Sequence, residues 1–143
     1  MLPLTDFITG GACRQEFPGR MPTSNTQKKN LKSVLKTLVS EGHDPLRSHY
    51  VMDIDGSKPH FNLDYSPCIT RSRAGSGGHW LSWKQRKMSL REICLLQGVD
   101  LDKINNTGVT DRQLAMVAGN AVPTPMLGRV LKEVLSAAGI KLR

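Results

Sequence analysis

The spacing of apolar residues predicts two amphipathic helices, one in each half of the chain. From residue 25 or 26 to Ser40, apolar side chains recur every three or four residues and lysines occupy the other face. From Thr124 to Ala138 a second stripe follows the same period until Gly139. Such stripes usually face a core. The stripe residues are Leu31, Val34, Leu35, Leu38 and Val39 in the first helix, and Met126, Leu127, Val130, Leu131, Val134, Leu135 and Ala138 in the second.

Capping signals predict two shorter helices between these. Ser89 and Glu92 fit a capping box, in which the serine hydroxyl accepts from the third helical amide and the glutamate accepts from the cap amide. Thr110 and Gln113 repeat this pattern at the next helix start. The predicted helices span residues 90–97 and 111–118.

Alternating residues predict short strands in the middle of the chain. Residues 49–55 alternate well, and residues 60–65 form a poorer strand or an extended segment. Residues 68–72 and 79–83 predict two more strands, separated by residues 74–78, whose glycines exclude regular structure. We expect these last two strands to pair as an antiparallel hairpin with a glycine-rich tip. The elements together predict an α+β fold with a small, irregular, β-rich region.

Composition narrows the class of protein. At 143 residues the chain is one modest domain or one piece of a larger one. It has no apolar run of the roughly 18 residues that a membrane span needs, and its first residues do not resemble a signal peptide. We therefore expect an intracellular protein. Three cysteines without a CxxC pair predict neither a disulfide framework nor a metal site.

The formal net charge of +8 favours a polyanionic partner, because a positive field raises the rate of encounter with nucleic acid. The positive charge alone is equally consistent with a solvated basic surface on a protein that binds no nucleic acid. The glycine-rich tip is the best candidate for nucleic-acid contact, since glycine admits a close approach and nearby arginines can contact guanine or phosphate. A mobile surface turn is the alternative. The flanking basic residues are Arg71, Arg73, Lys84, Arg86 and Lys87.

A bend between the last two helices is the second candidate site. Gly119 and Asn120 form a pair that tolerates left-handed backbone and leaves main-chain amides exposed to a ligand. Thr124 is expected to cap the helix that follows, with Pro125 at its first position. A purely structural turn is the alternative.

These segments together resemble a known family. The chain reads R-K-M-S-L-R-E-I-C-L-L-Q-G from Arg86, and G-N-A-V-P follows from Gly119. In order, spacing and helical context they resemble the last two motifs of the DNA cytosine-5 methyltransferases. The resemblance covers residues 66–135. One departure is that Val117 and Ala118 stand where the family often has glutamine and an aromatic or small residue.

The resemblance implies double-stranded DNA as partner and S-adenosylmethionine as cofactor. It places the glycine-rich tip in a target-recognition region that enters the major groove, and it places the bend against the methyl donor. Arg91 and Glu92 are interpreted as structural. The implied cofactor-binding residues are Asn120, Ala121 and Val122, and the implied DNA-binding residues are Thr70, Arg71, Ser72, Arg73, Gly75, Gly77 and Gly78.

Cys68 resembles the family's nucleophile only locally. A thiolate that adds to C6 of cytosine makes C5 nucleophilic towards the donor methyl group, and the family's nucleophile sits in a Pro-Cys pair. The order of motifs argues against Cys68, since no Glu-Asn-Val motif follows it and no Phe-x-Gly-x-Gly donor loop occurs. Cys68 is therefore expected to be a buried thiol, and the chain is expected to hold no catalytic residue.

By this interpretation the chain is the C-terminal part or small subunit of a DNA cytosine-5 methyltransferase, inactive without an N-terminal catalytic part or partner chain. Residues 1–48 form a variable loop and helix, residues 49–108 the target-recognition region, and residues 109–143 helices that pack on a missing donor-binding domain. Alone, the chain should expose its last apolar stripe. Restriction–modification and epigenetic roles, and in eukaryotes the nucleus, fit this interpretation. A gene fragment, a catalytically dead nucleic-acid-binding module and a relative acting on RNA stay open.

Overall fold

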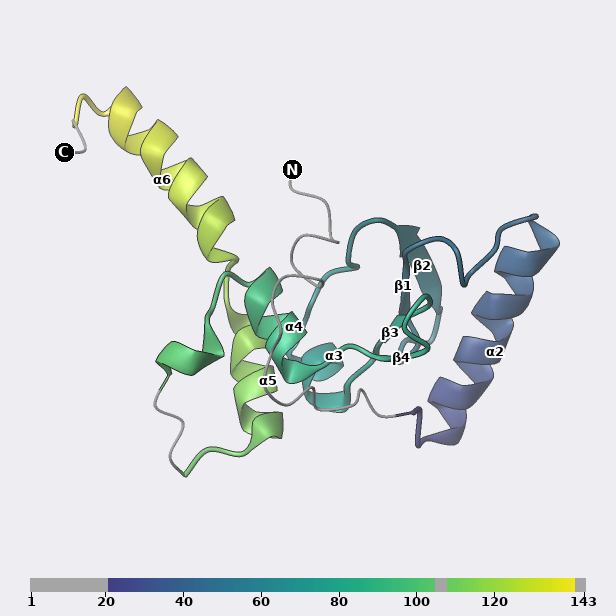
Figure 1. Ribbon diagram of the computed structural model, residues 1–143. Coiled ribbons are helices and arrows are strands. Elements are labelled where there is room, and N and C mark those ends of the chain that lie inside the picture. Colours follow the sequence, from purple (N-terminus) through teal and green to yellow (C-terminus); the bar gives the residue numbers. More distant parts are fainter. Residues whose placement is uncertain (1–20, 105–107, 141–143) are drawn as a thin grey trace.

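The computed structural model describes residues 21–104 and 108–140 of the chain. Helices and a small antiparallel sheet make an α+β fold, as predicted (Figure 1). Within the described residues, no helix is both long enough and apolar enough to cross a membrane. The elements are α2 (Asn25–Ser40), β1 (Tyr50–Asp53), β2 (His60–Leu63), α3 (Arg71–Ser76), β3 (His79–Leu81), β4 (Arg86–Lys87), α4 (Leu90–Leu96), the 3-10 helix η1 (Leu101–Lys103), α5 (Asp111–Asn120) and α6 (Thr124–Ala137).

The four strands form one antiparallel sheet in the order β2-β1-β3-β4. Because successive side chains of a strand point to opposite faces, β1 contributes to two cores. Tyr50 and Met52 pack with Val34 and Leu38 of α2, whereas Val51 packs with residues of α3, α4 and α5. The sheet therefore lies between α2 on one side and α3, α4 and α5 on the opposite side (Figure 1).

The predicted capping boxes are both present, at the starts of α4 and α5. In α4 the Ser89 hydroxyl accepts from the Glu92 amide at 3.2 Å, and the Glu92 carboxylate accepts from the Ser89 amide at 2.8 Å. In α5 the Thr110 amide donates to Gln113 Oε1 at 2.9 Å. Local sequence signals thus determine where these two helices begin.

The predicted glycine-tipped hairpin is wrong. Residues 71–76 form helix α3, and β3 pairs with β1 and β4 rather than with a strand over residues 68–72. Gly77 ends α3 in the left-handed conformation (φ 63°), and the Gly78 amide donates to the Arg73 carbonyl at 2.8 Å. The glycines therefore close and pack a short helix.

Helix α6 projects away from the rest of the chain (Figure 1), and none of its side chains is buried. The predicted exposure of its apolar stripe is confirmed. The predicted cap is wrong, because α6 begins after Pro123, and the Thr124 hydroxyl donates to the Gln97 carbonyl at 3.1 Å. That bond ties the start of α6 to the end of α4. Exposed apolar side chains on and near this helix include Met126, Leu127, Val130, Leu131 and Val134 on α6, Val117 on α5 and Val122 before α6.

Candidate functional site

The residues predicted to contact DNA lie on and around α3. Thr70, Arg71 and Ser72 are exposed together at its start, and the two hydroxyl oxygens are 3.4 Å apart. Among the described residues, no carboxylate lies within ion-pair distance of Arg71. This end of α3 therefore presents a cation and two hydroxyl groups to solvent.

Arg73, which was predicted to act with them, turns inward. Its Nε donates to Asp53 Oδ2 at 2.8 Å, and its Nη1 lies 3.9 Å from Asp55 Oδ2. Asp53 is buried at the end of β1, where an unpaired carboxylate would be costly. The arginine thus fastens α3 to the sheet. Sequence reasoning missed this pairing, although the Asp-Ile-Asp run at the end of a predicted strand was a visible signal.

Asp55 also joins α2 to α3. Its carboxylate accepts from Gln27 Nε2 in α2 at 2.9 Å and from the Ser76 hydroxyl at the end of α3. Asn30 of α2 donates to two carbonyl groups of the β1–β2 connection, at 2.9 and 2.8 Å. These bonds hold the first turns of α2 beside the last turn of α3.

His79 lies buried beside Asp53, which is its partner across β1 and β3. Burial lowers the pKa of its imidazole, and the negative charge of Asp53 offsets this only in part. The ring is therefore neutral near pH 7 and serves as a packing group in the sheet.

Glu92 holds the basic residues before α4. Two nitrogens of Arg86 donate to its carboxylate at 2.8 and 2.7 Å, and Lys84 Nζ lies 3.2 Å from it. Burial alone would raise the pKa of Glu92, but hydrogen bonds from Arg86 and the Ser89 amide, with the charges of Arg86 and Lys84, lower it overall. Arg91 pairs with Asp102 at 2.7 Å. The geometry fits the structural interpretation of both Arg91 and Glu92.

Helices α3 and α5 cross closely because glycines line their contact. A Cβ at Gly119 would lie 2.6 Å from the Thr70 carbonyl oxygen, and a Cβ at Gly75 would lie 2.6 Å from Cγ of Met116. No side chain fits at position 119 without moving the backbone of the neighbouring segment. The exposed start of α3 is thus fixed directly against the end of α5.

The bend after α5 differs from its prediction. Gly119 and Asn120 remain helical, and the chain leaves through Ala121 in an extended conformation (φ −75°, ψ 149°), without a left-handed residue. Gly119 is needed for the contact with α3 and not for the bend. Asn120, Ala121 and Val122 are all exposed, next to the start of α6. The three predicted cofactor-binding residues therefore form an open surface.

The described residues contain two free cysteines, Cys68 and Cys94. Cys68 is exposed in the connection before α3, so the prediction that it is buried is wrong. Cys94 is buried in α4, and burial raises the pKa of its thiol. Within the part of the chain that the structure describes, no three His, Cys, Asp or Glu side chains are grouped to hold a metal ion.

Comparison with known proteins assigns the family. A family model described as C-5 cytosine-specific DNA methylase matches residues 9–136. This span is wider than residues 66–135, which carry the resemblance in sequence motifs, and it includes the sheet, α3 and the bend after α5. No curated protein and no solved structure matches the chain. Because the match covers most of its length, the chain belongs to the family of C-5 cytosine-specific DNA methylases.

Proposed function

We propose that this chain is the C-terminal part or small subunit of a DNA (cytosine-5)-methyltransferase. It contributes target recognition through α3 and one wall of the S-adenosylmethionine site through the bend after α5. The family methylates cytosine in DNA and uses S-adenosylmethionine as methyl donor. The observation that carries the proposal is the uncovered surface made by the bend and the stripe of α6.

An apolar stripe on a helix is stabilising only when another surface covers it. Val122 before α6 is 53% exposed, and Val130 and Leu131 in the middle of α6 are 51% and 47% exposed. A continuous exposed apolar surface of this kind is typical of a protein interaction site. Its position directly after the donor-facing bend is what a domain that completes the donor site would require.

The bend suits one wall of a cofactor site. Asn120 offers an exposed side-chain amide, and Val122 offers an exposed apolar side chain. These groups would bind and orient S-adenosylmethionine, which supplies the sulfonium methyl group, while the remaining walls come from the catalytic part. The nucleophilic thiolate also belongs there. Cys68 is exposed, but it follows no donor loop and precedes no Glu-Asn-Val motif.

Target recognition falls to the exposed start of α3 in this proposal. Arg71 is available for a base edge or a phosphate, and Thr70 and Ser72 offer hydroxyl groups beside it. Arg73 acts indirectly, because its pair with Asp53 fixes the orientation of α3. The close contact of Thr70 with Gly119 joins the recognition segment to the donor wall without an intervening flexible link.

The test is reconstitution from two parts. The chain is mixed with a separately expressed family protein that carries the donor loop, the Pro-Cys pair and the Glu-Asn-Val motif. Transfer of tritiated methyl groups is then measured on duplex DNA and on RNA. Transfer to duplex DNA in the mixture alone supports the proposal. DNA binding without transfer from any such mixture would assign a non-enzymatic binding module, and transfer to RNA alone would assign an RNA methyltransferase.

A further inference from the structure

Helix α2 carries an excess of positive charge that the recognition segment does not use. It contains four lysines and no carboxylate, so it accounts for half of the formal net charge of +8. Lys28, Lys32 and Lys36 are each four residues apart and therefore lie in one row, about 12 Å long, along the helix. Lys29 lies beside this row, and all four side chains are exposed.

Carboxylates compensate many other cations of the fold but not these. Among the described residues, none of the four lysines of α2 has an ion pair. Like charges four residues apart destabilise a helix, and the first turn of α2 has no acidic residue to offset them. A polyanion would relieve this repulsion. The cations elsewhere that contact carboxylates include Arg47, Arg73, Lys84, Arg86, Arg91 and Lys103.

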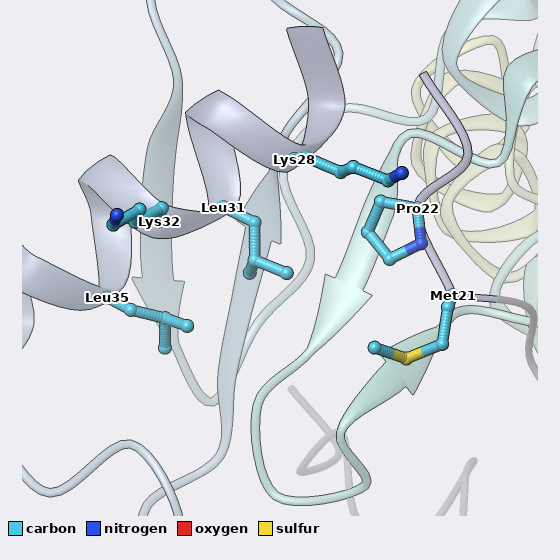
Figure 2. A pocket seen from close by; sticks show the side chains of 6 residues that line it. All are labelled: Met21, Pro22, Lys28, Leu31, Lys32 and Leu35. Atoms are coloured by element: carbon cyan, nitrogen blue, oxygen red, sulfur yellow. The ribbon is translucent and has the colours of Figure 1, made fainter. Parts of the chain in front are cut away.

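The row is held in a fixed position. Val34 and Leu38 bury the inner face of α2, and the hydrogen bonds of Gln27 and Asn30 hold its first turns. Figure 2 shows Lys28 and Lys32 at an apolar hollow of about 550 Å³, which Met21, Pro22, Leu31 and Leu35 complete. The aliphatic part of a lysine can lie along such a surface while its ammonium group stays in water.

We propose that the row of Lys28, Lys32 and Lys36 binds the phosphates of one DNA strand outside the target base pairs. Ammonium groups about 6 Å apart along a helix match the through-space separation of neighbouring phosphates of one strand, which exceeds the axial rise of about 3.4 Å per step because the strand winds around the axis. The start of α2 is joined to the end of α3 through Asp55, so the row keeps a fixed position relative to α3. Phosphate contacts position a protein without reading sequence. The inference rests on the proposed function in one respect only, because it takes duplex DNA as the ligand.

The experiment measures binding of the full chain to a fluorescein-labelled 24-base-pair duplex, and separately to a labelled RNA hairpin, by anisotropy over a series of KCl concentrations. The test variant is K28Q/K32Q/K36Q. The matched control is K103Q/R129Q/K132Q, which removes the same charge from exposed positions elsewhere. If each lysine of the row contacts one phosphate, the slope of log affinity against log salt should fall by about 2.7 in the test variant. The control should change it by less than about one.

Each other outcome overturns this inference. Equal changes in the two variants would mean that only diffuse charge acts. A change confined to an RNA hairpin would assign a different ligand to the row. Circular dichroism and urea unfolding of both variants check that the fold is retained. We expect it to be retained because all six side chains are exposed. The proposed function is tested separately. Methyl transfer in the reconstituted mixture without a row-specific salt effect would overturn the inference alone, and a row-specific effect without methyl transfer would overturn the proposed function alone.

Discussion

Helices α2 and α6 have similar lengths and the same apolar period, but their surroundings differ. Leu38 of α2 is completely buried against the sheet, whereas Leu131 of α6 is 47% exposed. An amphipathic pattern shows that a helix needs a covering surface, but it does not show which chain provides that surface. For α2 the surface is within this chain. For α6 we propose that it belongs to the donor-binding part of the enzyme.

The strongest test of this difference is a pair of equal truncations. Leu38→Ala should lower the free energy of unfolding by about 3 kcal/mol, because it removes a buried side chain and leaves a cavity. Leu131→Ala should change the free energy of unfolding by less than about 0.5 kcal/mol, since a side chain that is 47% exposed loses little buried surface on truncation. Urea unfolding of both variants measures the contrast. A large cost for Leu131→Ala would show that α6 packs on this chain in solution.

A glycine pair tests the same difference at the level of backbone contact. Gly119→Ala should destabilise by about 2 kcal/mol, because its Cβ would meet the Thr70 carbonyl oxygen at 2.6 Å. Gly128→Ala on α6 meets nothing within 4 Å and should stabilise by up to about 1 kcal/mol through helix propensity. Thermal unfolding followed by circular dichroism compares the two. Shifts in the same direction would contradict the close crossing of α3 and α5.

The ion cluster before α4 makes the covered region sensitive to acid. The folded pKa of Glu92 lies below its ordinary value of 4.5. Its stabilising effect is therefore complete above that value and is lost as the pH falls through the folded pKa. Glu92→Gln should cost about 2 kcal/mol at pH 7 and reduce the loss of stability between pH 5 and 3. Unfolding free energies measured at pH 7, 5, 4 and 3 provide the check; an unchanged acid dependence in the variant would assign that dependence to other groups.

A third contrast separates the two arginines of α3, and the change at Arg71 is the smallest effect expected. Arg71→Gln should weaken binding of a target duplex by about 1 kcal/mol, roughly fivefold, and leave the stability of the chain unchanged. Arg73→Gln should lower the unfolding midpoint, because Asp53 is then buried without its cation. Anisotropy and urea unfolding are measured on both variants. A change in binding for Arg73→Gln at unchanged stability would show that this arginine, too, reaches DNA.

Local signals predicted much of this fold. The capping boxes at Ser89 and Thr110, the stripe of α2 and the strand of β1 are all confirmed, because each depends on residues near one another in the chain. The hairpin prediction failed at residues 71–76. There Gly75 packs against Met116 of α5, which lies some forty residues later, whereas a local interpretation sees only the turn propensity of glycine.

The candidate site shows the same limit. Asn120, Ala121 and Val122 are exposed, and their contact with the cofactor stays a prediction. The opposite orientations of Arg71 and Arg73 were not predictable, because the carboxylates that hold Arg73 are at the end of β1. Cys68 was predicted as a buried thiol because the order of motifs argued against a nucleophile, whereas its position in an exposed connection depends on the whole fold.

We propose that the bend after α5 and the stripe of α6 bind a separate donor-binding domain. Titration calorimetry of the chain with such a domain from the family tests it most directly. We expect association with a negative heat-capacity change, which V130S/L131S abolishes and K103Q/R129Q/K132Q retains. Absence of association, or association that the double variant leaves intact, would contradict it.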